Sequence, residues 1–306
     1  MDGNCTNPRK FSYQVLARAT NNFSEKGKLG EGATGSVFKG NLKELSCVVA
    51  VKRVVFGSKY GIESYLPEVK ILAKLRHENL VSLIGWSCNK KELLIAYEYV
   101  GNKTVGNKTL EYHLFKETDF LTWGQRKTIA RGLASALLYL HEERDDEQSI
   151  LHCDIKLDNI LLDLNFNPKL CDFGLARPVE DEEESGYPTV LTGAPGYLAP
   201  ECKKSGRATK ESDIYSFGVV VLQMACGKHA VKNLQRNGVK FELKLVDWVR
   251  KKIATGENIS AVADPRLGLS YDENEMEKLI RVGLSCANPN PDYRPSTMEL
   301  IKMLKY

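Results

Sequence analysis

The sequence predicts an α+β fold with two lobes: a small antiparallel-sheet lobe with one helix, and a larger, mainly helical lobe. Val-rich, Gly-punctuated apolar alternation dominates residues 28–55, whereas apolar residues repeat every three or four positions after residue 122. The length of 306 residues suits two lobes that share a cleft, because single cores stop growing near that size. We expect a lead-in over 1–24, the small lobe over 25–97, a hinge over 98–109 and the large lobe over 110–306, with 28–304 forming one domain.

Local signals predict the elements of the first hundred residues. Apolar residues at helical spacing predict a short helix in the lead-in, around Val15, and a longer one over Ile62–Leu75. Apolar runs, the first two rich in Val or flanked by Gly, predict strands over Ser36–Lys39, Cys47–Val54 and Leu93–Val100. The small lobe is therefore expected to be mostly sheet.

Helical signals dominate the rest of the chain. Thr122 and Gln125 have the spacing of a capping box, and a long amphipathic pattern follows them. A second buried helix is predicted over Asp213–Cys226, with Gly227 ending it. Two further helices are expected on the surface, over Glu275–Ala287 and Ser296–Leu304.

The composition excludes several classes of protein. The net charge of +4 arises from 43 basic and 39 acidic side chains spread along the chain, which predicts no nucleic-acid partner. Eight scattered cysteines without close pairs favour a reducing cytosol, so we expect a cytoplasmic location. The most apolar run, Phe217–Cys226, is shorter than the roughly 20 residues that span a bilayer, so no membrane segment is expected in this chain.

A glycine-rich stretch, GEGATGSV, lies where the first strands are predicted. Glycines at this spacing let a backbone fold closely over phosphates and present its N–H groups. The alternative is a purely structural hairpin turn, because the signal alone is weak. The candidate nucleotide-binding residues here are Gly30, Glu31, Gly32, Ala33, Gly35 and Val37.

A lysine follows on the next predicted strand, in Val49-Ala50-Val51-Lys52. Apolar neighbours, Ala50 among them, would hold the Lys52 ammonium in one place, where triphosphate oxygens could pair with it. Glu68, on the following helix, is the natural counter-ion. Taken singly, both residues have ordinary surface alternatives.

The densest group of polar residues is His152-Cys153-Asp154-Ile155-Lys156-Leu157-Asp158-Asn159, followed by Asp172-Phe173-Gly174 and Ala199-Pro200-Glu201. Asp154 is a candidate proton acceptor and Lys156 a candidate for balancing phosphoryl charge. Asn159 and Asp172 offer hard oxygen ligands of the type that Mg²⁺ prefers. With Asp154 in the acid–base role, His152 is expected to pack and hydrogen-bond.

These motifs, in this order, resemble those of protein kinases. The resemblance implies ATP and Mg²⁺, with Mn²⁺ as an alternative, and a protein substrate. It also implies that Tyr97 lies behind the adenine, that Glu98 to Val100 form the adenine-binding hinge, and that Glu201 pairs with Arg294. Asp213 would hold the catalytic loop.

Four longer segments resemble plant receptor-like kinases, especially those with an L-type lectin ectodomain. They are Phe11–Gly32, Leu121–Glu143, Ser205–Lys228 and Ala263–Leu267. The resemblance covers roughly residues 11–304 and implies a Ser/Thr kinase domain on the cytosolic face of the plasma membrane, behind a lectin domain and a membrane helix. We expect the chain to be the cytoplasmic portion of such a receptor or a truncated relative, tethered to the membrane in the first case.

Four features depart from the kinase pattern. Cys153 replaces the usual Arg, so activity is expected to depend little on phosphate at the activation-segment residues Ser185, Tyr187, Thr189 and Thr192. Ala194 lacks the hydroxyl that a Thr would offer Asp154, and Pro67 precedes Glu68, which predicts a strained ion pair to Lys52.

The fourth departure is a tandem repeat, VGNKT, at residues 100–104 and 105–109, which reads as a lengthened loop at the mouth of the nucleotide site. Its Asn-Lys-Thr sequons matter only in a secreted protein. The acidic run at residues 180–184 is either a solvated loop or a phosphate mimic that attracts basic substrates. Cys171, before Asp172, is either open to alkylation or an inert buried thiol.

Two functions follow. The favoured one is an ATP-dependent Ser/Thr kinase that also phosphorylates itself, because Lys52, Asp154, Asn159 and Asp172 are all present. The alternative is a nucleotide-binding signalling scaffold with weak turnover, for which Ala194, Pro67 and the VGNKT repeat are the arguments.

Overall fold

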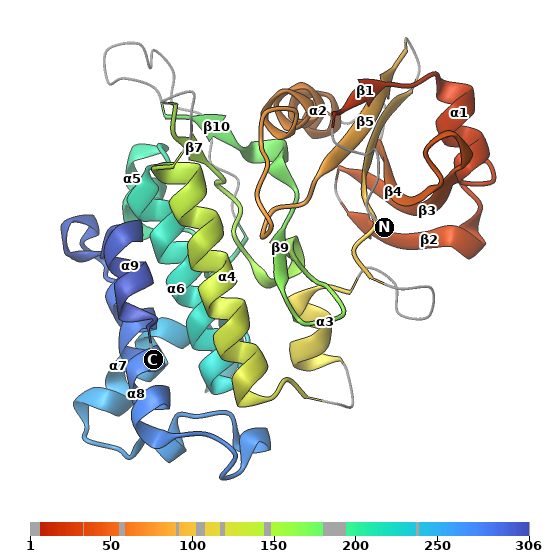
Figure 1. Ribbon diagram of the computed structural model, residues 1–306. Coiled ribbons are helices and arrows are strands. Elements are labelled where there is room, and N and C mark those ends of the chain that lie inside the picture. The colour runs from red at the N-terminus through yellow and green to blue at the C-terminus, as the bar shows by residue number, and fades with distance from the viewer. Residues whose placement is uncertain are drawn as a thin grey trace.

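The computed structural model describes residues 7–32, 34–54, 59–89, 92–101, 108–116, 120–143, 148–179, 194–236 and 239–305. A sheet lobe built from the first hundred residues lies beside a lobe built mainly of helices (Figure 1). The predicted α+β class with two lobes is confirmed.

The small lobe contains a six-stranded sheet in the order β1-β5-β6-β4-β3-β2. Its strands are β1 (Arg9–Lys10), β2 (Lys28–Gly32), β3 (Gly35–Leu42), β4 (Cys47–Val54), β5 (Leu83–Cys88) and β6 (Leu93–Glu98). The pairing is antiparallel except between β1 and β5. Strand β4 has the predicted bounds, β3 extends beyond its predicted core, and β6 ends two residues before the predicted end. Strand β5 was not predicted, because its sequence does not alternate.

The lead-in adds strand β1 to the edge of this sheet and packs helix α1 (Tyr13–Ala19) against it. Helix α1 begins at Ser12, whose hydroxyl accepts a hydrogen bond from the Val15 N–H. Phe11 is buried among apolar side chains of the sheet. The position of the Phe11 ring requires glycine at position 85, because a Cβ there would lie 2.4 Å from Phe11 Cε2 and 2.1 Å from the Arg9 carbonyl oxygen. The short helix predicted in the lead-in is therefore present, and it packs against the sheet of the small lobe.

Helix α2 (Lys59–Leu72) crosses the sheet and begins and ends three residues before its predicted bounds. Tyr65 and Leu72 anchor it in the main hydrophobic core. The Tyr65 hydroxyl donates to the Ser87 carbonyl oxygen on β5 at 2.9 Å. These contacts fix the helix that carries Glu68.

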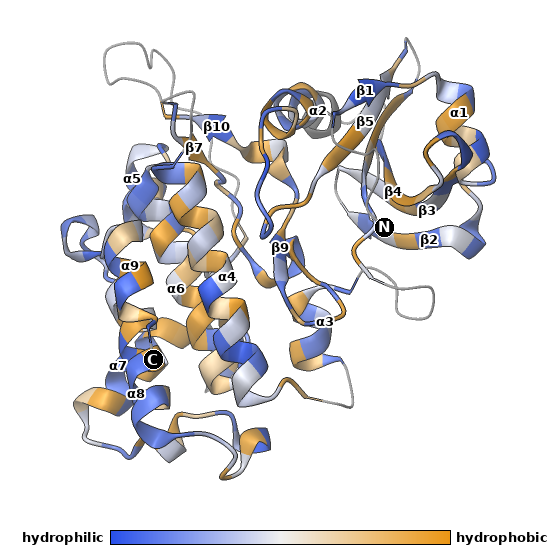
Figure 2. Ribbon diagram, in the orientation of Figure 1, coloured by the Kyte–Doolittle hydropathy of each residue, from blue (hydrophilic) through white to orange (hydrophobic). Residues whose placement is uncertain are grey.

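The large lobe is organised around two long helices, α4 and α6. Its helices are α3 (Leu110–Phe115), α4 (Trp123–His141), α5 (Pro200–Ser205), α6 (Lys210–Cys226), α7 (Leu245–Ala254), α8 (Glu273–Cys286) and α9 (Thr297–Met303). The predicted Thr122–Gln125 capping box starts α4, and Gly227, at φ 61°, ends α6. Hydrophobic residues recur along α4 (Figure 2). Helices α8 and α9, expected on the surface, each bury one face.

The large lobe also contains short strands, which form two-stranded sheets. They are β7 (Ile150–Leu151), β8 (Ile160–Leu162), β9 (Pro168–Leu170), β10 (Arg177–Pro178), β11 (Val231–Arg236) and β12 (Val239–Lys244). Strands β11 and β12 form a hairpin between α6 and α7 that we did not predict, although Asn237-Gly238 between alternating runs is a hairpin signal. Within the described residues, no helix is both long and apolar enough to cross a membrane.

Candidate active site

The glycine-rich stretch forms the β2–β3 hairpin, with Gly30 opposite Val37 and Gly32 opposite Gly35. A Cβ at Gly35 would lie 2.2 Å from the Arg53 carbonyl oxygen, so the fold itself requires glycine there. At Gly30 and Gly32, by contrast, a Cβ would meet nothing within 4 Å. Packing within the protein therefore does not require glycine at positions 30 and 32. Glycine at these positions would instead allow a ligand to approach the backbone closely. Ala33 and Glu31 complete the stretch; Glu31 pairs with Lys28 at the surface, and Ala33 lies outside the described residues.

Lys52 lies between two carboxylates at the interface of the lobes. Strand β4 places it opposite Val37, and its Nζ lies 2.9 Å from Glu68 Oε2 and 3.0 Å from Asp172 Oδ1. Burial lowers the pKa of Lys52, but the charges of Glu68 and Asp172 outweigh burial and leave that pKa raised. Burial raises the pKa of Asp172, yet Lys52 holds it below the ordinary value. Lys52 and Asp172 are therefore both charged at neutral pH.

The expected strain from Pro67 does not appear in this ion pair. Pro67 lies inside α2, but the Lys52–Glu68 distance of 2.9 Å is normal and Glu68 is only 1 % exposed. The reason is a second anchor for the carboxylate: the Tyr97 hydroxyl donates to Glu68 Oε1 at 2.7 Å. Burial, and then the negative charge of Glu68, raise the Tyr97 pKa, so the phenol stays protonated and keeps donating.

Tyr97→Phe tests this anchor. Loss of a hydrogen bond to a buried carboxylate is expected to lower the free energy of unfolding by roughly 1.5–3 kcal/mol and to weaken positioning of the Lys52–Glu68 pair. Urea denaturation measures the first effect and the KM for ATP the second. An unchanged denaturation midpoint and KM would show that Pro67 and its neighbours position Glu68 without Tyr97.

The hinge residue Glu98 connects the two lobes through its side chain as well as through the backbone. Glu98 exchanges hydrogen bonds with Ser82, and its carboxylate also pairs with Lys169 of β9 at 3.0 Å. Val100, at the end of the hinge, is buried. Ala50, buried opposite Tyr97 on the neighbouring strand, lies in the same sheet. We did not predict the role of Lys169, because a lone lysine in a turn-flanked strand has no sequence signal for a partner 71 residues away.

The catalytic-loop side chains converge on one carboxylate oxygen. Lys156 Nζ lies 2.5 Å from Asp154 Oδ2, and Asn159 Nδ2 donates to the same oxygen at 2.8 Å and to the Asp154 carbonyl oxygen at 2.8 Å. Within the described part of the chain, no hydrogen bond is recorded to Asp154 Oδ1. The arrangement therefore fixes Asp154 through one oxygen and leaves the other available to accept a proton.

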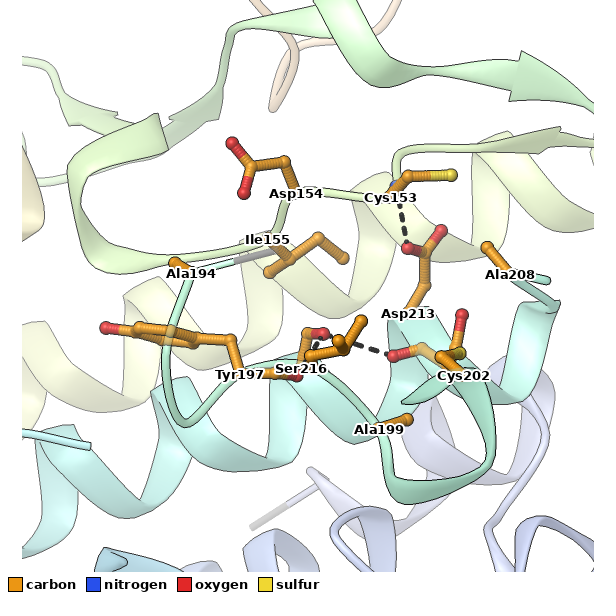
Figure 3. A pocket seen from close by; sticks show the side chains of 12 residues that line it. Cys153, Asp154, Ile155, Ala194, Tyr197, Ala199, Cys202, Ala208, Asp213 and Ser216 are labelled. Atoms are coloured by element: carbon orange, nitrogen blue, oxygen red, sulfur yellow. Dashed lines mark hydrogen bonds between the residues drawn. The ribbon is translucent and has the colours of Figure 1, made fainter. Parts of the chain in front are cut away.

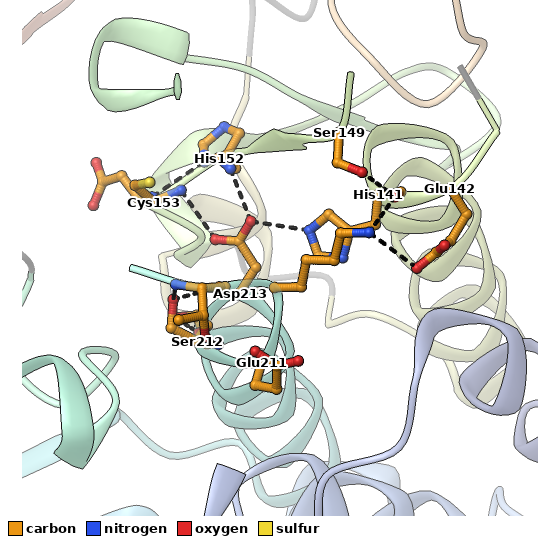
Figure 4. Close-up of polar contacts among 12 residues, drawn as sticks. His141, Glu142, Ser149, His152, Cys153, Glu211, Ser212 and Asp213 are labelled. Atoms are coloured by element: carbon orange, nitrogen blue, oxygen red, sulfur yellow. Dashed lines mark hydrogen bonds and ion pairs between the residues drawn. The ribbon is translucent and has the colours of Figure 1, made fainter. Parts of the chain in front are cut away.

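Asp213 holds the backbone of this loop (Figure 4). Its carboxylate accepts hydrogen bonds from the His152 N–H at 2.8 Å and the Cys153 N–H at 3.0 Å, and it pairs with His141 Nε2 at 3.2 Å. Burial raises the Asp213 pKa, but these donors outweigh burial and lower it. Cys153 has a left-handed backbone, φ 67°, and Asp213 stabilises this turn.

His152 is a buried structural residue, as expected. Its Nδ1 accepts a hydrogen bond from the Asp154 N–H at 3.2 Å, and its Nε2 lies 3.1 Å from the Cys171 carbonyl oxygen. The ring packs edge-on against Phe173, with centroids 4.8 Å apart. His152 thus links the two loops that carry Asp154 and Asp172.

Asn159 and Asp172 meet because they flank the β8–β9 hairpin. Ile160 pairs with Leu170, and the Cys171 N–H donates to the Asn159 carbonyl oxygen at 2.9 Å. The Asn159 amide nitrogen donates to Asp154, and among the residues that the structure describes no donor bonds the Asn159 side-chain oxygen, so this oxygen can act as a ligand beside the Asp172 carboxylate. An amide and a carboxylate oxygen are hard ligands that fit Mg²⁺.

Two departures from the kinase pattern lie around a small cavity beside Asp154 (Figure 3). Cys153, Asp154 and Ala194 line this cavity of about 20 Å³, which is large enough for one water. Burial and Asp213 raise the pKa of the Cys153 thiol, so it is neutral. Burial also raises the pKa of Cys171, whose thiol donates to the Asn159 carbonyl oxygen, which favours the inert alternative over alkylation.

Glu201 of α5 and Arg294 form the expected pair in the large lobe. Arg294 Nη1 and Nη2 lie 2.6 and 2.8 Å from the two Glu201 oxygens, and the arginine side chain is fully buried. Arg294 also donates to the Asn288 and Glu211 carbonyl oxygens. The pair braces the segment that leads from Ala194 into α6.

Several predicted features lie outside the described residues. They are Ser185, Tyr187, Thr189, Thr192, the acidic run at 180–184 and most of the VGNKT repeat, at 102–107.

Comparison with known proteins identifies relatives along nearly the whole chain. The family model described as "Protein kinase domain" matches residues 23–304. The chain is 46 % identical over 304 residues to the L-type lectin-domain containing receptor kinase IX.2 of Arabidopsis thaliana, covering 98 % of this chain and 44 % of the relative. It is 42 % identical over 298 residues to the L-type lectin-domain containing receptor kinase SIT2 of Oryza sativa subsp. japonica, covering 97 % and 43 %. The chain thus spans less than half the length of these relatives, and the predicted resemblance is confirmed.

Proposed function

The chain belongs to the protein kinase domain family, and from that premise we propose that it is an active Ser/Thr kinase that uses ATP and also phosphorylates itself. One observation carries the proposal. A continuous series of contacts joins Lys52 to Asp172 at 3.0 Å, the Asp172 loop to Asn159 at 2.9 Å, and Asn159 to Asp154 at 2.8 Å. The groups that would bind phosphate, hold metal and accept a proton are therefore joined in one connected set of contacts.

Each group has a distinct chemical task in this proposal. Lys52 pairs with phosphate oxygens of ATP, and the glycine-rich hairpin covers them with backbone N–H groups. Asp154 orients the substrate hydroxyl and accepts its proton as the new O–P bond forms and the bond to ADP breaks, while Lys156 balances charge on the moving phosphoryl group. Asn159 and Asp172 would hold Mg²⁺, which supplies charge neutralisation when bound.

We further propose that the domain works in receptor-type signalling at the cytosolic face of the plasma membrane. The names of the relatives support this: they are L-type lectin-domain containing receptor kinases, and this chain matches less than half of each. The expected partners are ATP and a protein substrate.

The rival function is a nucleotide-binding scaffold with little turnover, and Ala194 beside Asp154 is the observation that favours it. Transfer of radiolabelled γ-phosphate with Mg²⁺, run beside Asp154→Asn and followed by mapping of the modified residues, separates the two. The proposal predicts label on Ser and Thr that depends on Asp154. Nucleotide binding without label would select the scaffold, and label confined to Tyr would refute the Ser/Thr assignment.

A fourfold variant tests independence from loop phosphate. With Cys153 neutral where an Arg would meet phosphate, Ser185→Ala, Tyr187→Phe, Thr189→Ala and Thr192→Ala together are expected to change kcat by less than about threefold. The measurement is steady-state transfer to an exogenous peptide. A loss of tenfold or more would imply that another cation, such as Arg177 beside the Cys153 thiol, binds an activating phosphate.

A further inference from the structure

The β11–β12 hairpin begins beside the segment that borders the catalytic carboxylate. Ala194, Tyr197 and Asp154 line one cavity (Figure 3). Gly196, between the first two, packs on the start of the hairpin: a Cβ there would lie 2.6 Å from Val231 Cγ2. The hairpin is therefore continuous with the surface on which a substrate must present its hydroxyl to Asp154.

One face of this hairpin carries apolar residues without a partner in the core. The register pairs Lys232 with Leu243 and Leu234 with Phe241, which puts Leu234 and Leu243 on the same face. Both leucines are half-buried, and neither belongs to the hydrophobic core clusters of the described residues. This face can therefore contact another molecule.

The backbone of the hairpin is also available for pairing. Strands β11 and β12 form a separate two-stranded sheet, and no third described strand pairs with either. Each strand therefore has an outer edge of unpaired N–H and C=O groups, as used in β-augmentation.

The positive charge of the hairpin favours an acidic binding partner. Over residues 231–244 the basic residues are Lys232, Arg236, Lys240 and Lys244, against the single acid Glu242. Lys232 is exposed. Lys232 lies on the same face as Leu234 and Leu243, because it pairs with Leu243. An extended segment with acidic and apolar residues at every second position, and therefore on one face, complements both the charge and the apolar residues of this face.

We propose that the β11–β12 hairpin is a docking strand for protein substrates, which binds an extended acidic and apolar segment and so brings the attached Ser or Thr to Asp154. The proposal rests on the kinase function proposed above. The hairpin contacts Gly196, in the segment that borders Asp154. The molecule that binds the hairpin is therefore proposed to be the protein substrate rather than a second copy of this chain.

Three peptides test the proposal, each with the same Ser acceptor and a flexible linker to an extension. In the extension, every second residue is in turn Glu and Val, Lys and Val, or Gln and Gly, with Asn at the positions between, so that the two varied residue types share one face. The enzymes are the wild type, Lys232→Glu, and a form with residues 233–242 replaced by Asn-Gly, which joins the paired positions Lys232 and Leu243 by a two-residue turn. Lys302→Glu, at an exposed site on α9, is the matched control.

The wild type and Lys302→Glu are expected to show a kcat/KM about tenfold higher for the Glu-Val peptide, mainly through KM, a ratio that a few cross-strand pairs supply. Both hairpin variants should lose this preference while the Gln-Gly peptide is unaffected. Equal values for the three peptides, or a preference that survives both variants, would overturn the proposal. Faster phosphate transfer to every peptide by the variant with the shortened hairpin would also overturn the proposal. That result would indicate that the hairpin binds the chain's own acidic run at 180–184.

Direct binding separates this proposal from the kinase function on which it rests. Fluorescence anisotropy of the labelled Glu-Val peptide is expected to give tighter binding to the wild type than to Lys232→Glu, whether or not label is transferred. Tight, Lys232-dependent binding without transfer would refute the kinase function alone. Transfer without any difference in binding would refute the docking strand alone.

Discussion

Asp154→Asn is expected to lower kcat for phosphoryl transfer by roughly 10²–10⁴-fold, the range that general base catalysis contributes. The amide has the shape of the carboxylate and retains an oxygen that can accept from Lys156 and Asn159, which now lie 2.5 and 2.8 Å from Asp154 Oδ2. It cannot accept the proton of the substrate hydroxyl. The KM for ATP should change little, because Lys52 and the glycine-rich hairpin are untouched.

Asp292→Asn serves as the matched control, since Asp292 is exposed on the large lobe. Its kcat should equal that of the wild type. Thermal unfolding of Asp154→Asn should show a folded, cooperative protein. If Asp154→Asn kept more than about a tenth of wild-type turnover, another group would be the proton acceptor and the assignment of Asp154 would be wrong.

Lys52→Met is expected to affect stability and activity together. Glu68 is 1 % exposed, so removal of its cation leaves a buried, uncompensated charge, and the free energy of unfolding should fall by roughly 3–5 kcal/mol. Turnover should fall by about 10²–10³-fold, because a preorganised positive charge on the phosphates is lost. Urea denaturation and steady-state transfer measure the two effects.

A second substitution separates these effects. In Lys52→Met with Glu68→Gln, the buried charge is gone, so most of the lost stability should return while turnover stays low. Lys203→Met, at an exposed position on α5, is the control and should shift stability by less than about 0.5 kcal/mol. Recovery of turnover in the double variant would show that Lys52 serves folding rather than phosphate binding.

The motif residues were predictable because their chemistry demands particular residue types. Only glycine satisfies the close approach at Gly35, and a magnesium site needs hard oxygens such as those of Asn159 and Asp172. Their meeting point could also be anticipated, since the two residues bracket a short hairpin. The described geometry brings these residues together.

Other contacts could not be predicted, because they join residue types that have many alternative partners. The Tyr97 hydroxyl and Glu68 are 29 positions apart, and nothing in either local sequence names the other. For the same reason the effect of Pro67 could not be judged from the sequence alone. The Lys52–Glu68 ion pair forms at 2.9 Å although Pro67 lies inside α2, and the Tyr97 hydrogen bond also holds the carboxylate. The burial of Phe11 likewise depends on the distant Gly85.

In the proposed kinase, nucleotide binding and phosphoryl transfer use different residues of one connected set of contacts. A paired measurement on the wild type and Asp154→Asn tests it most directly: calorimetric affinity for ATP with Mg²⁺, and single-turnover transfer of radiolabelled γ-phosphate to Ser or Thr. The account predicts equal affinities and transfer only by the wild type. Equal transfer by both proteins, or binding without transfer by the wild type, would contradict it.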